Sequence, residues 1–296
     1  MVVEKSRNLY FYTKPSNMKI LTIAISSFAL LGFFACTKPS KSSDQVNVNP
    51  LRTKPEARNQ EGTKLLGESY TENGTIRWTT FYYDGNSNRI SKITDSTMDL
   101  SDLTTAPSEI STAFYIYDSN NKLTEIKSKQ NGVTGTTTLL TYNNAGQLIE
   151  KDFPSVGRTI FRYNTDGKVI GDSSFDTRVN QWTNATVRGY DNNGNQIMEE
   201  EWFFDSTTNA LALTARDSIA FDDKATPYNS IDRSANEFSF FQHNPTLLFI
   251  TAYPSTHLFQ QPYSYVYNNS QVPKQATRFQ DDTVTQSAVV TKYYYY

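Results

Sequence analysis

The sequence predicts an all-β protein: an antiparallel meander of hairpins that is curved or closed into a barrel-like sheet. Three observations support this fold class. Aromatic residues make up 14% of the 296 residues, while all hydrophobic residues together reach only 37%, a mixture typical of many half-exposed strands. A motif of an aromatic residue followed by Asp or Asn recurs along the chain. The residues before each motif, such as 113–117, are β-prone or alternate in polarity, as a strand requires.

The N-terminal segment has the features of a secretory signal. Residues 20–34 are mostly apolar and follow Lys19. A helix of that length rises only about 22 Å, which is short of the roughly 30 Å hydrocarbon core of a bilayer. We therefore interpret residues 1–35 as a signal peptide. Met18 and Lys19 form a complete short n-region, which indicates that translation starts at Met18.

The next four residues, Phe33-Phe34-Ala35-Cys36, resemble the lipobox of bacterial lipoproteins. The small Ala35 fits this pattern, whereas Phe33 and Phe34 depart from it. The resemblance implies cleavage before Cys36, diacylglycerol on its thiol and a fatty acyl group such as palmitate on its amine. At about 0.8 kcal/mol per buried methylene, these chains would anchor the protein to the outer membrane. The alternative is an ordinary signal peptide with Cys36 as a free thiol.

Residues 36–60 are expected to be the lipidated Cys and a disordered tether. Pro, Ser, Lys and Asn dominate this stretch, and no apolar period appears. Such a composition cannot bury enough apolar surface to fold, and a flexible coil of this length spans about 25–30 Å. The remaining residues, 61–296, are expected to form one β domain of repeats.

Each copy of the motif has the chemistry of a turn between two strands. The Asp or Asn side chain can accept hydrogen bonds from the backbone that follows it. Four residues after the Tyr, four copies have a residue that tolerates positive φ: Asn121, Gly146, Gly167 and Gly194. The copies, the last two of them degenerate, are Tyr83-Asp84, Tyr117-Asp118, Tyr142-Asn143, Tyr163-Asn164, Tyr190-Asp191, Phe221-Asp222 and Tyr267-Asn268.

These motifs, best seen in residues 143–148 and 164–169, resemble the YD repeat of RHS-type bacterial proteins. Residues 65–296 as a whole resemble a family of lipoproteins from diderm bacteria that is related to those repeats and has a porin-like β fold. The resemblance implies a closed or strongly curved sheet and an envelope location. This chain is too short for the RHS shell and its autoproteolytic core, so a toxin-enclosing role is not implied.

The composition excludes several function classes. A single Cys and two His residues leave no internal disulfide and no multi-His metal site. The formal net charge of −2 disfavours nucleic acid as a partner. No nucleotide-binding fingerprint or nucleophile elbow is present, so no catalytic, cofactor-binding or metal-binding residue is assigned. The densest acidic cluster is Glu199-Glu200-Glu201. Glu199 and Glu201 alternate on one face of a strand and could reach the separation that glycoside hydrolysis needs; the alternative is a charged strand edge.

Three tryptophans, Trp78, Trp182 and Trp202, are candidates for stacking on sugar rings, with cross-strand packing as the alternative. The sequence therefore favours a non-catalytic envelope lipoprotein that is structural or binds a glycan or an envelope protein. A polysaccharide hydrolase is the second hypothesis. An outer-membrane barrel is the third, because residues 289–296 end in aromatics; a lipid anchor and the absence of a clean apolar-out alternation argue against it.

Overall fold

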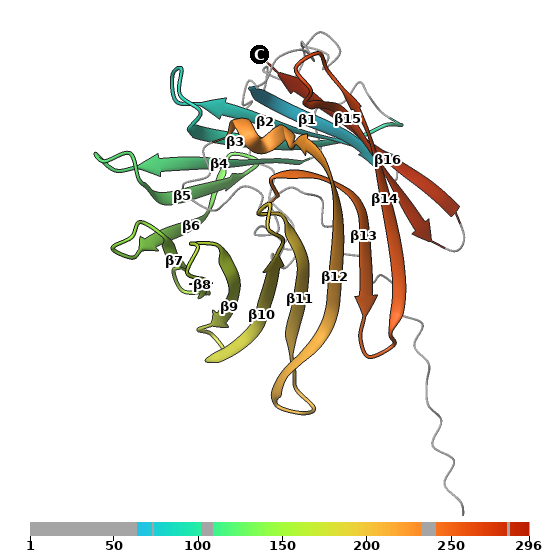
Figure 1. Ribbon diagram of the computed structural model, residues 1–296. Helices are drawn as coiled ribbons and strands as arrows, with labels where there is room; N and C mark the ends of the chain where they lie inside the picture. The colour runs from blue at the N-terminus through green and yellow to red at the C-terminus, as the bar shows by residue number, and fades with distance from the viewer. Residues whose placement is uncertain (1–63, 73, 102–108, 232–240, 283–284, 296) are drawn as a thin grey trace, which may run out of the picture. The chain divides into compact units, whose positions relative to one another are not determined.

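The computed structural model describes residues 64–72, 74–101, 109–231, 241–282 and 285–295, and these form a closed antiparallel barrel (Figure 1). The predicted fold class is confirmed, and the sheet closes because β1 pairs with β16. The signal segment, Cys36 and the tether lie outside the described residues. The strands are β1 (Leu65–Glu72), β2 (Thr75–Tyr83), β3 (Ile90–Asp99), β4 (Glu109–Tyr117), β5 (Leu123–Gln130), β6 (Val133–Tyr142), β7 (Leu148–Phe153), β8 (Gly157–Tyr163), β9 (Val169–Asp176), β10 (Gln181–Tyr190), β11 (Gln196–Asp205), β12 (Ala210–Ala225), β13 (His243–Ala252), β14 (His257–Tyr267), β15 (Pro273–Asp282) and β16 (Thr285–Tyr295).

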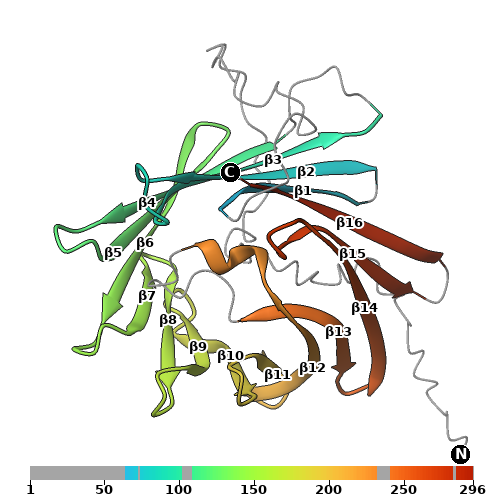
Figure 2. The same cartoon turned by 45° about the horizontal axis from the view of Figure 1, so that its top comes forward.

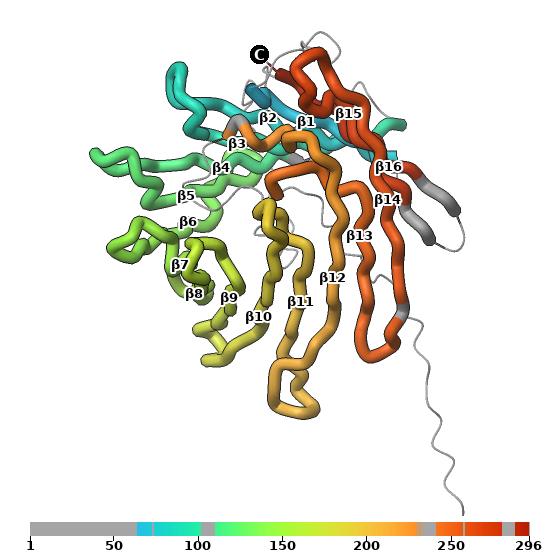
Figure 3. Tube along the Cα trace, in the orientation of Figure 1, coloured from blue at the N-terminus to red at the C-terminus, as the bar shows by residue number. Residues whose placement is uncertain are grey.

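Every strand pairs with its neighbours in the sequence, so each connection is a hairpin and the chain circles the barrel once (Figure 3). The turns that carry the aromatic–Asp/Asn motif each follow an even-numbered strand (β2–β3, β4–β5 and so on to β14–β15). They all lie at one end of the barrel, which we call the motif rim. The turns that follow the odd-numbered strands (β1–β2, β3–β4 and so on to β15–β16) lie at the opposite end, which we call the far rim. The two rims are therefore built from chemically different turns.

Side chains alternate between the barrel lumen and the outer face. The register also holds where β1 and β16 close the barrel. Glu68 on β1 lies opposite Thr79 on β2 and Tyr293 on β16, so these three side chains share one face of the sheet. That face lines the lumen. The helix η2 (Pro227–Ser230) follows β12 and crosses the barrel opening, where the Tyr228 hydroxyl donates a hydrogen bond to Glu68 at 2.5 Å (Figure 2). This 3-10 helix is the only helix in the described part of the chain.

The predicted turn chemistry is confirmed in four of the five clear copies, while in the copy at Tyr83 the Asp84 carboxylate accepts from the Arg89 side chain. In each of the four, one side-chain oxygen of the Asp or Asn accepts two backbone N–H groups, at the second and fourth residues that follow, over 2.8–3.0 Å. Asn121, Gly146, Gly167 and Gly194 all have positive φ, between 63° and 89°. A β-branched residue at these positions would be strained, which explains why only Gly and Asn occur there.

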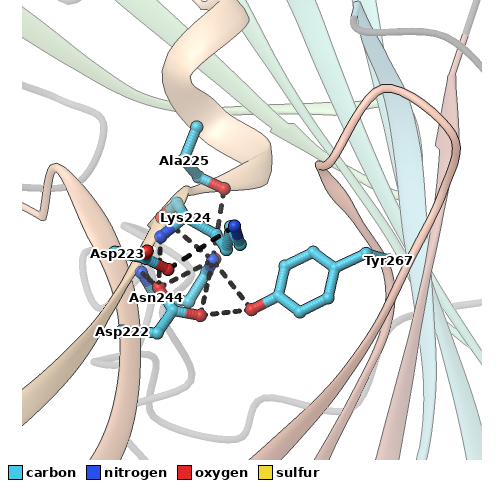
Figure 4. A network of polar contacts seen from close by, with 6 residues as sticks. All are labelled: Asp222, Asp223, Lys224, Ala225, Asn244 and Tyr267. Carbon is cyan, nitrogen blue, oxygen red and sulfur yellow. Dashed lines mark hydrogen bonds and ion pairs between the residues drawn. The ribbon is translucent and has the colours of Figure 1, made fainter.

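The two degenerate copies are turns of the same kind. Asn268 accepts the N–H groups of Ser270 and Val272, and Gln271 takes the positive φ of 60° that Gly has elsewhere. In the other copy, Asp222 accepts the N–H of Lys224 at 2.9 Å and that of Asn244 at 3.1 Å (Figure 4). The N–H of Asn244 therefore takes the place that the fourth residue after the Asp or Asn has in the other copies, although Asn244 lies 22 residues after Asp222. The segment between them, which includes η2, is an insertion within one turn of the repeat.

Four of the motif tyrosines have a second role that the sequence did not indicate, and Tyr265 and Tyr295 share it. Near the end of an even-numbered strand, the Tyr hydroxyl donates to a backbone carbonyl near the start of the preceding strand. The two strands have no connection at the motif rim, so this hydrogen bond ties adjacent hairpins together there. The donor and acceptor pairs are Tyr83 and Leu65, Tyr117 and Ile90, Tyr163 and Leu148, Tyr190 and Val169, Tyr265 and Pro245, and Tyr295 and Pro273.

Candidate functional site

The three candidate tryptophans lie on the outer face, but the structure brings only two of them to one region. Trp182 on β10 and Trp202 on β11 are on adjacent strands, whereas Trp78 on β2 lies on a distant part of the barrel wall. Trp182 packs edge-on against Phe175, with ring centroids 5.3 Å apart, and is still 40% exposed. Trp202 lies opposite Ala185 and is half-buried.

These residues belong to a continuous apolar region, which we call the aromatic face. Three cross-strand pairs on β9 to β12 build it: Phe175 with Trp182, Trp202 with Leu213, and Phe204 with Leu211. Its members meet because β-strands place every second residue on one face and the bulges at 182/184 and 201/202 keep that alternation in phase across the strands. Sequence reasoning found the two Trp residues, but not the aliphatic residues beside them.

Two Arg–carboxylate pairs border the aromatic face. Arg178 donates to Asp176 at 2.6 Å beside the β9–β10 turn, and Arg216 pairs with Glu200 on the neighbouring strands. The hydrogen bonds from Arg178 lower the pKa of Asp176 to about 2, so this carboxylate is charged at neutral pH. Arg158 lies over the Phe175 ring, 5.6 Å from its centroid. Exposed rings with planar charged groups beside them can stack on and hydrogen-bond a polar, ring-shaped ligand.

The acidic cluster lies in the lumen, so the interpretation of it as a strand edge is wrong. β11 is paired on both sides, and Glu199 and Glu201 share one face, as their spacing predicted, and that face is the lumen. Arg188 bridges Asp172 and Glu199, with its Nε 2.9 Å from the Glu199 carboxylate. Asp217, opposite Glu199, is buried. Burial and then the nearby charges of Glu199 and Glu201 raise the pKa of Asp217 to about 7.

A second buried cluster joins the insertion to the barrel wall. Tyr228 packs edge-on against Tyr293, with centroids 6.4 Å apart, while its hydroxyl contacts Glu68. Burial raises the pKa of Glu68 to about 7, although the Tyr228 hydrogen bond acts in the opposite direction. On β3, Asp95 accepts a hydrogen bond from Thr79 at 2.6 Å, and burial raises its pKa to about 6. No local pattern marks these carboxyls, because their burial depends on strands far apart in the sequence.

Charged residues cover the outer face of β5 to β8. Lys127, Lys129, Arg158 and Arg162 are exposed on this wall, and their register places them opposite the lumen-facing set. A Lys or Arg on the lipid side of a barrel costs about 2–4 kcal/mol at the bilayer midplane. This part of the wall therefore lacks the apolar band that a membrane-spanning barrel needs.

Among the residues that the structure describes, no group of three or more His, Cys, Asp or Glu side chains is arranged to hold a metal ion. Within the same residues, no helix is long and apolar enough to cross a membrane.

Comparison with solved structures supports the fold. A porin-like protein from Bacteroides uniformis matches with a TM-score of 0.54 and 10% identity, over 79% of this chain and 98% of that one. A porin-like protein from Bacteroides vulgatus matches with a TM-score of 0.38 and 8% identity, over 79% of this chain and 99% of that one. No family model matches the sequence, and no curated protein does. The first match shows that the chain shares the barrel fold of a porin-like protein.

Proposed function

We propose that this protein is a non-catalytic, lipid-anchored protein of the bacterial outer envelope that binds a glycan through the aromatic face. The observation that carries the proposal is Trp182, which keeps 40% of its surface exposed beside Phe175. An isolated exposed aromatic residue needs no explanation, but one within an apolar region bordered by two ion pairs is typical of a binding surface. The porin-like fold of the Bacteroides uniformis protein is compatible with an envelope location.

The anchor in this proposal is Cys36, the only Cys of the chain, directly after the apolar segment. We expect the wild-type protein, produced in a diderm bacterium, to incorporate an alkyne-labelled fatty acid and to sediment with membranes. Cys36→Ala removes the thiol that would carry the diacylglycerol, so this variant should carry no label. Label on the variant at the wild-type level would contradict lipidation at this residue.

The binding face is tested with a pair of variants matched for exposure. We expect the purified protein to bind a subset of a glycan array, and Trp182→Ala to weaken that binding roughly tenfold or more, because a stacked ring at the centre of a small site carries much of its affinity. Leu139→Ala is the control, since Leu139 is 41% exposed on the outer face of β6, away from the aromatic face. Equal binding by both variants, or no glycan bound at all, would overturn the proposal.

Hydrolysis of a polysaccharide is the second candidate, and one observation favours it. Glu199 is paired with Arg188 while its neighbour Asp217 has a pKa of about 7, and two carboxyls with different protonation are what acid–base cleavage of a glycoside needs. Asp217 is buried, however, so a substrate cannot reach it without movement of the wall. Binding without cleavage is therefore the better-supported proposal.

A further inference from the structure

The two ends of the barrel differ in the chemistry of their turns. At the motif rim, the turns consist of Asp, Asn, Ser, Gly, Lys and similar residues, and the nearest exposed large hydrophobic side chains of the described residues, Ile170, Ile197 and Val266, lie in the adjoining strands and are 37–47% exposed. The far rim carries exposed large hydrophobic side chains on five hairpins: Leu100, Val156 and Val179 in the turns, and Val133 and Leu258 at the starts of β6 and β14. Val133 and Val179 are the most exposed, at 71% and 62%. Apolar residues at turns, where polar residues are the rule, call for an explanation.

These tips lie on one ring, because hydrogen bonds join neighbouring hairpins at this end. The N–H of Leu100 donates to Gly74 at 2.8 Å, and the N–H of Thr177 donates to Val156 at 3.0 Å. The N–H of Asn131, in the turn before Val133, donates to Ile110 at 2.7 Å. These bonds hold the hairpin of Leu100 beside that of Val133, and the hairpin of Val156 beside that of Val179, so apolar tips of neighbouring hairpins lie side by side.

The spacing of the tips favours a lipid surface over a protein partner. Polar turn residues with positive φ stand between the apolar tips: Asn131, Ser155 and Asn180. A protein interface needs a packed, continuous apolar core, whereas side chains that enter a bilayer surface need no complementary shape. Lys129 and Arg158 lie on the outer wall next to this rim, where they can meet lipid phosphates and prevent deeper insertion.

We propose that the far rim, defined by Leu100, Val133, Val156, Val179 and Leu258, inserts into the surface of a phospholipid bilayer. This contact is separate from the acyl anchor, and it adjoins the aromatic face, because Val179 lies in the turn between Phe175 and Trp182.

The test uses the full chain carrying Cys36→Ala, so that no acyl group contributes, and vesicles of phosphatidylcholine with or without phosphatidylglycerol, which contain no glycan. We expect this protein to float with the vesicles. Adding Val133→Asp and Val179→Asp should lower the bound fraction roughly tenfold or more, since each change places a charge among acyl chains. The matched control adds Leu139→Asp and Ile170→Asp, exposed on the wall but outside the ring, and should bind like the parent.

A second measurement does not depend on the folding of the charged variants. Because the parent carries Cys36→Ala, Val179→Cys gives it a single Cys, and brominated lipids should quench a fluorophore attached there. Flotation of the parent with selective loss in the rim variant, together with quenching, supports the proposal. Three results would each overturn it: no flotation of the parent on either vesicle, as expected if the rim serves a protein partner; equal loss in both double variants; or an unquenched fluorophore at residue 179. Glycan binding and the label at Cys36 are measured separately, so these failures are distinguishable from failure of the proposed function.

Discussion

Deletion of β16, residues 285–296, is expected to abolish cooperative folding of the barrel. β16 pairs with both β15 and β1 and is the strand that closes the sheet. Its residues Tyr293, Tyr294 and Tyr295 are buried. Burial of three Tyr side chains contributes on the order of 10 kcal/mol, which is comparable to the whole stability of a typical domain of about 5–15 kcal/mol. The deletion also leaves β1 and β15 as open edges, which promote aggregation.

Thermal unfolding followed by circular dichroism, together with size-exclusion chromatography, tests this expectation. The control is Tyr295→Phe, which keeps the buried ring and removes only the hydroxyl that donates to Pro273. We expect a modest loss for the control, about 1 kcal/mol, because one hydrogen bond is removed. A truncated protein that stays monomeric and melts within a few degrees of the wild type would contradict a barrel closed by β16.

The free energy of unfolding is expected to fall by a few kcal/mol as the pH rises from about 5 to about 8. Burial raises the pKa of Glu68 from 4.5 to about 7 and that of Asp217 from 3.8 to about 7. Over this pH range the folded protein therefore holds protons that the unfolded chain releases. A carboxyl whose pKa is higher in the folded protein stabilises the fold fully at pH values below its pKa in the unfolded chain. That contribution is lost as the pH rises through its pKa in the folded protein. At about 1.4 kcal/mol per pKa unit, Glu68 alone contributes on the order of 3 kcal/mol.

Melting temperatures across this pH range in buffers of constant ionic strength test the prediction. Glu68→Gln and Asp217→Asn replace each carboxyl by a neutral group of similar shape, and should each flatten the profile. Asp205→Asn is the control. Hydrogen bonds in its turn lower the pKa of Asp205, so this carboxyl changes the pH dependence of stability only below about pH 4, and the variant should keep the wild-type slope between pH 5 and pH 8. A wild-type profile that rises from pH 5 to pH 8 would show that these carboxyls are not buried as described.

Part of the candidate site could be predicted from the sequence. Trp182 and Trp202 were identified by residue type, and the shared strand face of Glu199 and Glu201 by their spacing. The neighbours that turn the two Trp residues into a surface come from β9 and β12, and the basic partner of Glu199 comes from β10. Such cross-strand neighbours depend on register, and the bulges that set the register have no clear local signal.

The sequence by itself determined the strands and the turns of the motif rim. An Asp or Asn that accepts two backbone N–H groups, followed by a residue with positive φ, is a local device, so residues such as Asn143 and Gly146 specify a turn wherever they occur. Only the tertiary structure decided the closure by β1 and β16, the Tyr hydrogen bonds between hairpins, and the burial of Glu68 under Tyr228. These features join residues from 15 to more than 200 positions apart, and their free energy exists only once the barrel has brought distant strands together.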